Sequence, residues 1–252
     1  KAVALTDIVQ VSLLVLGGII ITVIALNKVS DGAGVLAGFK VLTQRFPEKF
    51  DMILSPDNPH YKDLPGLAVL FGGMWMMNVS YWGFNQYIIQ RGLAAKDIAE
   101  AQKGVLFAAF LKLLVPVIVV IPGIAAVVLA PGLSKPDQAY PTMMGLLPTG
   151  VLGLVFAALI AAIMASLASK INSVATIFTL DFYAKLRPDQ DEATLVRVGR
   201  VASLIAVALG MLAAKPLLGS FDQAFQYIQD FTGYFTPGIT VIFLLGLFWK
   251  RA

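Results

Sequence analysis

Long apolar runs constrain this chain more strongly than any other feature of its sequence. A helix needs about 20 mostly apolar residues to cross the hydrocarbon core of a bilayer. The runs lack the alternation of barrel strands, and only helices and closed barrels satisfy the backbone in lipid. The sequence therefore predicts an all-α membrane protein with six transmembrane helices in one unit. These spans cover residues 5–26, 66–90, 105–129, 150–180, 196–217 and 221–249, with an outer loop over residues 27–65.

Composition agrees with a membrane protein and excludes several other classes. Hydrophobic residues make up 58% of the chain and charged residues 13%, whereas soluble domains average about 25% charged residues. The net charge of +4 comes without a basic run, so we expect no nucleic-acid partner. Cysteine is absent and His60 is the single histidine, which excludes thiolate and His-rich metal sites. The first residue is Lys1 rather than Met, so we expect a piece of a longer protein.

Basic residues indicate the orientation, because cytoplasmic loops carry an excess of Lys and Arg. The opposite side offers only Lys135 and Lys215 in its short loops, and the outer loop balances its basic residues with acids. We therefore expect a multi-pass protein of the inner (plasma) membrane with both chain ends in the cytoplasm, and a short surface helix near residues 34–53. The basic residues assigned to the cytoplasm are Lys1, Arg91, Lys96, Lys103, Lys185, Arg187, Arg197, Arg200, Lys250 and Arg251.

Polar residues inside the second span favour a binding role. Asn78 and Tyr81 are three residues apart and share a helix face. An amide can donate to and accept from a hydroxyl, and an aromatic face packs on the apolar face of a sugar ring. The alternative is that the amides of this span bridge neighbouring helices.

Two further features each allow two interpretations. They are Lys112 in the third span and a stripe of small residues along the fourth span. Lys112 either donates to a substrate oxygen or reaches the cytoplasmic surface with its ammonium group. The stripe favours close helix packing, and its members are Ala158, Ala162, Ser166, Ser169 and Ser173. The alternative is a sodium site, because a Ser166 hydroxyl and a carbonyl near Ala162 are the oxygen ligands that hard cations prefer.

The sixth span is predicted to be a broken helix. Thr232-Gly233 and Pro237-Gly238 interrupt it, and broken helices at membrane depth occur where backbone lines a cavity. Phe225 and Gln229 lie on one face before this break. A binding role and a purely structural kink both remain open.

At these residues the chain resembles the sodium/solute symporter family, and most closely its bacterial sodium/glucose–galactose branch. The resemblance implies two inverted five-helix repeats, of which the spans would be the last helix of the first repeat and all of the second. A sugar, membrane lipid and the preceding repeat of the same transporter would be the partners. The matching stretches are KAVALTDIVQV (1–11), NVSYWGFNQYIIQR (78–91), EAQKGVLFAAFLKLL (100–114), ASLASKINSVATIFT (165–179) and FQYIQDFTGYFTPG (225–238).

The resemblance also implies roles for single residues. Asn78, Lys112 and Gln229 would bind the sugar, Tyr81 would be an aromatic inner gate, and Phe225 would belong to an outer gate. Ala162 and Ser166 would be ligands of the coupling sodium ion, and Asp7 would lie near its cytoplasmic exit.

Two departures from the family pattern concern sodium. The family usually has a Ser-Ser pair where this chain has Ala165-Ser166, so one hydroxyl ligand is lost. Lys170 lies one turn beyond Ser166, where related sequences tend to be apolar, and its charge would repel Na⁺. Lys170 would otherwise reach inward or pair with Asp7. We therefore expect weakened or altered sodium coupling.

The leading functional prediction is sodium-coupled secondary transport of a glucose- or galactose-like monosaccharide by alternating access. The alternatives are a symporter of the same family for an amino acid, sialic acid or vitamin, and a sodium-independent or non-transporting solute sensor. Acidic residues are almost confined to loops, so a membrane enzyme is not expected.

Overall fold

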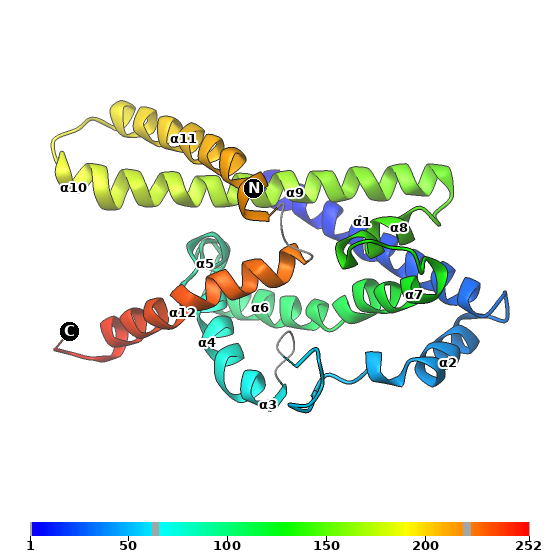
Figure 1. Cartoon of the computed structure of the whole chain (residues 1–252). Coiled ribbons are helices and arrows are strands. Elements are labelled where there is room, and N and C mark those ends of the chain that lie inside the picture. Colours follow the sequence, from blue (N-terminus) through cyan, green and yellow to red (C-terminus); the bar gives the residue numbers. More distant parts are fainter. Residues whose placement is uncertain (1, 62–65, 219–222, 252) are drawn as a thin grey trace.

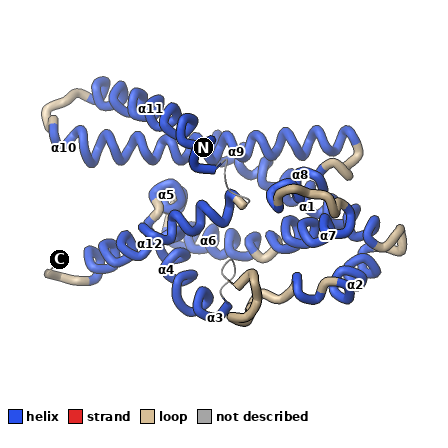
Figure 2. Tube along the Cα trace, viewed as in Figure 1, coloured by secondary structure: helices blue, strands red, loops and turns tan. Residues whose placement is uncertain are grey.

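The computed structural model describes residues 2–61, 66–218 and 223–251, and all regular structure within these ranges is helical (Figures 1 and 2). Within these described ranges, five helices are long and apolar enough to cross a membrane. They cover Asp7–Val29 within α1 (Ala2–Val29), Ile98–Leu129 over α6 (Ile98–Lys112) and α7 (Ile121–Leu129), Thr149–Leu186 over α9 (Thr149–Ile177) and α10 (Ala184–Leu186), Glu192–Leu217 within α11 (Glu192–Leu218), and Ala224–Phe248, which is α12.

The second predicted span is not one of these five helices. Residues 66–93 are divided among α3 (Gly66–Ala68), α4 (Met74–Val79), α5 (Gln86–Leu93) and two π-helical turns, η2 (Val69–Gly73) and η3 (Ser80–Phe84). The helix breaks at Asn85, whose backbone is extended with φ −84° and ψ 113°. Asparagine favours such a break because its side chain competes with the backbone for hydrogen bonds.

The break predicted in the sixth span is wrong, because α12 runs without interruption from Ala224 to Phe248. Pro237 removes one backbone donor, but leaving a helix inside a bilayer would unpair several more. The hydroxyls of Thr236 and Thr240 also donate to the carbonyls of Thr232 and Thr236, each at 2.8 Å. The carbonyl that Pro237 leaves without a backbone donor is that of Gly233, and the two hydroxyls bond neighbouring carbonyls rather than this one.

The outer loop contains the expected surface helix, but it is shorter than predicted. Helix α2 (Val35–Arg45) ends at Arg45, and a 3₁₀ turn, η1 (Pro47–Lys49), follows. Gly38 lets α2 approach the end of α1 closely, since a Cβ atom at residue 38 would overlap with the carbonyl oxygen of Leu26. This contact ties the loop to the membrane helices.

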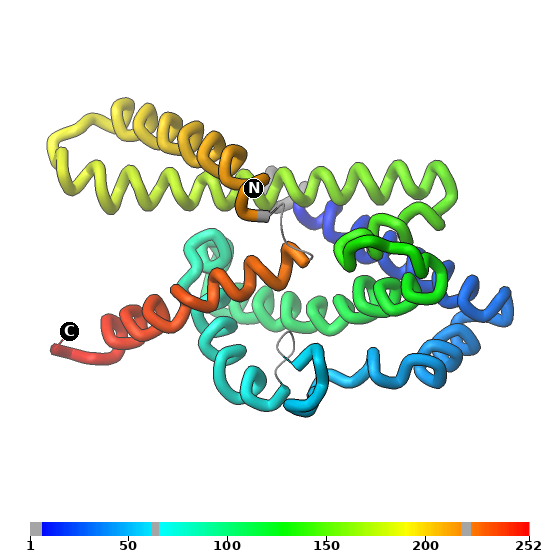
Figure 3. The backbone as a smooth tube through the Cα atoms, in the orientation of Figure 1, coloured from blue at the N-terminus to red at the C-terminus, as the bar shows by residue number. Residues whose placement is uncertain are grey.

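The long helices lie side by side around a small core. In Figures 1 and 3, α9 and α11 run antiparallel along one edge, and α6 and α7 continue one another through the middle. Helix α1 packs against both α9 and α7, and the core between them is closed by α2 and α8 (Ala139–Met144). The remaining faces are apolar and exposed, as for Met211 (73%) and Leu212 (75%) of α11. Such faces suit contact with lipid or with another part of a membrane protein.

A threonine of α1 pairs with a carbonyl that a proline leaves free. A π-helical turn, η4 (Pro116–Val120), joins α6 to α7, and in such a turn each carbonyl bonds the N–H five residues on. The carbonyl of Val117 would therefore bond residue 122, but Pro122 has no N–H. The Thr22 hydroxyl lies 2.7 Å from the Val117 oxygen and fills this role, while the Gly18 carbonyl of its own helix is a second acceptor at 2.9 Å.

We expect Thr22→Val to lower the free energy of unfolding in detergent by roughly 0.6–2 kcal/mol, the range for hydrogen bonds between membrane helices. Thr232→Val is the matched control, because the Thr232 hydroxyl bonds only carbonyls of its own helix among the described contacts. In a Pro122→Ala background the Val117 oxygen regains a backbone donor, so the Thr22→Val penalty should shrink. An equal penalty in both backgrounds would contradict this pairing.

Candidate functional site

Residues 66–93, which we call the broken segment, and α6 together form an aromatic–lysine cluster. Its four side chains are Tyr81, Trp82, Tyr87 and Lys112. The Tyr81 ring meets the rings of Trp82 and Tyr87 edge-on, at centroid distances of 5.4 and 6.2 Å. The ammonium nitrogen of Lys112 lies 5.7 Å from the Tyr81 ring centroid and 5.1 Å from that of Trp82. A cation over such rings gains roughly 0.5–2 kcal/mol.

Lys112 lies deeper in its helix than the sequence indicated. The helix begins at Ile98 rather than near residue 105, so Lys112 is about four turns from its start. The side chain is exposed, and its ammonium group reaches the aromatic rings. A charged donor beside the exposed face of a tyrosine is an arrangement that suits a polyhydroxylated ring, which offers both C–H faces and hydroxyl oxygens.

Helix α5 is held against α9 and α1 by three of its polar side chains, which we call the α5 clamp: Gln86, Tyr87 and Arg91. The Ser173 hydroxyl donates to the Gln86 side-chain oxygen at 2.7 Å. The ammonium nitrogen of Lys170 lies 5.6 Å from the Tyr87 ring centroid.

Arg91 supplies the third contact of the α5 clamp and pairs with Asp7. Its guanidinium lies 3.1 Å from the carboxylate of Asp7 and donates to the Ser169 hydroxyl at 3.1 Å. The suggested pairing of Lys170 with Asp7 is therefore wrong, although α1 and α9 do adjoin. Arg91 occupies the carboxylate, and Lys170 turns to Tyr87.

Of the other predicted sugar residues, Asn78 lies one turn before Tyr81, whereas Phe225 and Gln229 belong to another helix. The Asn78 amide is exposed and donates to the Met74 carbonyl of its own helix at 2.8 Å. Phe225, 72% exposed, and Gln229 lie in the first turns of α12.

Helix α12 meets the broken segment about three turns beyond Gln229. The Phe243 ring stacks on Phe84 at 4.7 Å, and the Thr240 hydroxyl lies 3.5 Å from the Met76 carbonyl oxygen. The described contacts therefore do not bring Phe225 and Gln229 to Tyr81.

The predicted sodium ligands lie on α9, which packs against α1. Ala162 and Ala165 are half-buried and Ser166 is exposed. The Ala165 carbonyl accepts a hydrogen bond from Ser169 at 3.0 Å, which connects this part of α9 to Arg91. Among the described residues, no group of three or more acidic or histidine side chains could hold a metal ion.

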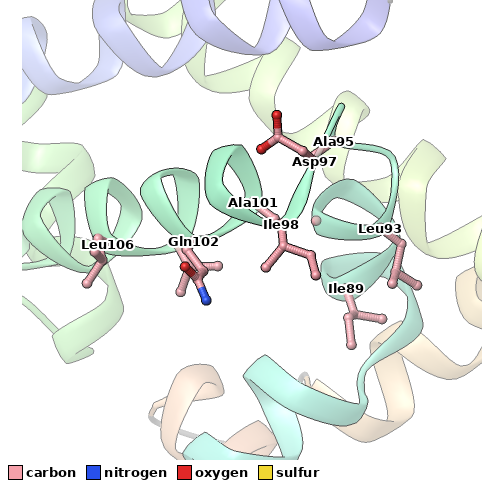
Figure 4. Close-up of a pocket in the computed structure, with 10 residues that line it drawn as sticks. Ile89, Leu93, Ala95, Asp97, Ile98, Ala101, Gln102 and Leu106 are labelled. Carbon is pink, nitrogen blue, oxygen red and sulfur yellow. The ribbon is translucent and has the colours of Figure 1, made fainter.

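A separate groove of about 740 Å³ lies between α5 and α6 (Figure 4). Leu93 and Ile98 border it from the two helices, and apolar side chains dominate its walls. Asp97 and Gln102 are the polar residues on its rim. A sugar needs several directed hydrogen-bond partners, so this groove does not suit one.

A family model described as the sodium:solute symporter family matches residues 1–252. The chain belongs to the sodium:solute symporter family. This family assignment confirms the resemblance seen in the polar stretches within the spans, and it makes the chain a multi-pass membrane protein of a transporter family rather than an enzyme.

Several symporters of this family align with the chain. It is 51% identical to a sodium/glucose cotransporter of Vibrio parahaemolyticus, over 100% of this chain and 49% of that protein. It is 41% identical to sodium/myo-inositol cotransporter 2 of Homo sapiens, over 77% of this chain and 31% of that protein. A sodium/mannose cotransporter of Bos taurus is 32% identical, over 100% of this chain and 46% of that protein. The chain spans about half the length, or less, of these relatives.

Sequence reasoning missed Tyr87 and the pairing of Arg91 with Asp7. Gln86 and Arg91 were visible as polar residues at the end of a span, and Ser169 and Ser173 belonged to the small-residue stripe. The spacing of Ser169, Lys170 and Ser173 could have predicted these contacts. It places the three residues on one face of α9, where they meet the polar side chains of α5.

Proposed function

We propose that this chain forms part of a secondary active transporter that couples uptake of a glucose- or galactose-like monosaccharide to sodium by alternating access. The aromatic–lysine cluster carries the proposal. Tyr81 would stack on the sugar ring and close its inward path, and Lys112 would donate to a hydroxyl, with Asn78 and Gln229 as further ligands and Phe225 above the sugar. The relatives named for glucose, myo-inositol and mannose support an uncharged polyhydroxylated ring rather than an amino acid, sialic acid or vitamin.

The proposed transporter needs more than the residues described above. The chain covers 49% of the Vibrio relative, and we propose that a preceding five-helix repeat supplies the other side of the sugar and sodium sites. Residues 66–93, which the structure divides into short helices, would also cross the membrane, so that the chain would have six spans in total. In that arrangement the Asn78 amide, which bonds the Met74 carbonyl here, would turn to the sugar once the preceding repeat encloses the site.

We also propose that the basic loops and both ends of this chain face the cytoplasm of the plasma (inner) membrane. In Figure 1 the α10–α11 connection and the C-terminal end lie at the left of the view, whereas the α1–α2 and α8–α9 connections lie at the right. This separation supports opposite sides for these two sets of segments, whereas α1 begins near the middle of the view. Asp7, paired with Arg91, would then lie on the cytoplasmic route that sodium takes after leaving Ala162 and Ser166.

The test is sugar counterflow in proteoliposomes that contain the full-length protein with this sequence. Vesicles loaded with unlabelled glucose or galactose should transiently accumulate labelled sugar above equilibrium, because a carrier exchanges its substrate across the membrane. A channel gives no such overshoot, and a sensor moves no sugar. Equal accumulation of labelled proline or sialic acid in place of the sugars would contradict the substrate assignment.

A further inference from the structure

The break at Asn85 is bridged by a bond between two side chains. The N–H groups of Ile88 and Ile89 both donate to the Asn85 carbonyl, so α5 starts afresh there at a new angle. Across this break the Tyr87 hydroxyl donates to the Tyr81 hydroxyl at 3.1 Å. The bond joins the last turn before the break, which carries Tyr81, to the first turn after it.

The Tyr87 end of this bond is anchored, while the Tyr81 end is more open. Tyr87 is half-buried, with Lys170 against its ring, and it lies between Gln86 and Arg91, which bind Ser173 and Ser169 of α9. Tyr81 is 40% exposed.

We propose that Tyr87 is the positioning residue of the gate ring: its hydroxyl holds Tyr81 at the angle that stacks on the sugar, and α9 holds Tyr87 in turn. This inference rests on the proposed function for its consequence in transport. The positioning of Tyr81 itself is inferred from the Tyr87–Tyr81 bond and from the contact of Lys170 with Tyr87. The gate ring is thereby connected through one side chain to α9, the helix that carries Ser166.

Phenylalanine substitutions isolate the bond, because each removes one hydroxyl and keeps the ring and its aromatic contacts. In the full-length protein, Tyr87→Phe should raise the equilibrium Kd for labelled glucose or galactose about 2- to 12-fold, the change that corresponds to roughly 0.5–1.5 kcal/mol for one hydrogen bond. The exchange rate at saturating sugar should not fall, because a less restrained gate does not slow release. Tyr234→Phe is the control, since Tyr234 is 83% exposed on α12.

A double-mutant cycle separates positioning from an independent role. Tyr81→Phe removes the acceptor of the same bond, so Tyr87→Phe should have little further effect on Kd when it is added to Tyr81→Phe. Additive effects, or a native Kd for Tyr87→Phe, would overturn the proposal. A fall in exchange rate with unchanged Kd would also overturn it.

A measurement without sugar keeps this inference distinct from the proposed function. Hydrogen–deuterium exchange of residues 86–93 should be about 2- to 12-fold faster in Tyr87→Phe than in the native protein, and unchanged in Tyr234→Phe. If the native protein binds no sugar, the proposed function fails, and this exchange result alone decides the positioning role. Unchanged exchange in Tyr87→Phe would then refute it.

Discussion

Replacing Lys112 by methionine should raise the sugar concentration for half-maximal uptake by roughly 10- to 150-fold. A hydrogen bond from a charged donor contributes roughly 1.5–3 kcal/mol, and this range sets the fold-change. Methionine keeps the length and apolar stem of the side chain but removes the charge that lies over Tyr81 and Trp82. Uptake of labelled sugar by proteoliposomes, measured over a range of sugar concentrations, gives the result.

Lys103→Met is the matched control for this substitution. Lys103 lies on the same helix, is exposed, and pairs with Glu100 one turn away at 2.8 Å. An exposed pair of this kind contributes little, so the half-maximal concentration should stay within about 2-fold of the native value. A similar loss in both variants would mean that the charge acts on folding or insertion rather than on the sugar.

Adding a hydroxyl at residue 165 should lower the sodium concentration for half-maximal uptake by roughly 10-fold or more. Ala165→Ser restores the oxygen ligand that the family usually has beside Ser166, and a polar contact to a full charge contributes roughly 1.5–3 kcal/mol. Ala157→Ser is the control, because Ala157 is exposed on the same helix about two turns earlier. No response to Ala165→Ser would remove residue 165 from the sodium site.

Lys170→Met tests the hypothesis of weakened sodium coupling by removing a positive charge. At an effective dielectric constant of about 20, a unit charge repels Na⁺ by about 1–3 kcal/mol over distances of about 6–12 Å. We therefore expect a shallow sodium dependence in the native protein that becomes steeper in Lys170→Met. Full, steep sodium dependence of native uptake, with little change in Lys170→Met, would contradict weakened coupling and would leave Lys170 only its contact with Tyr87.

Span length and hydropathy were enough to predict five of the membrane helices, but not the form of the second segment. Span length and hydropathy depend on local composition, so runs such as residues 105–129 predict a membrane helix directly. A break depends on which backbone groups find partners. Pro237 looked disruptive, yet α12 continues through it, while Asn85 looked like one more polar residue in an apolar run.

The same distinction applies to the candidate site. Tyr81 and Trp82 are neighbours in the chain, so their meeting was predictable. The contacts of Lys112 with these rings, and of Arg91 with Asp7, depend on how separate helices tilt and rotate, and hydrophobic periodicity does not determine either. The proposed ligands of α12 remain predictions, because they would meet the sugar only together with the preceding repeat.

The two sides of the Asn85 break are fastened to different bodies of the molecule. The turns before it pack on α12 through Phe84 and Phe243, and the helix after it is bound to α9 and α1. Any sliding of α12 past α9 must therefore be absorbed by the backbone torsions near Asn85, with Tyr81 beside the pivot. The extended backbone of Asn85 thus joins two segments with different packing partners, and the Tyr87–Tyr81 bond is the side-chain connection that crosses it.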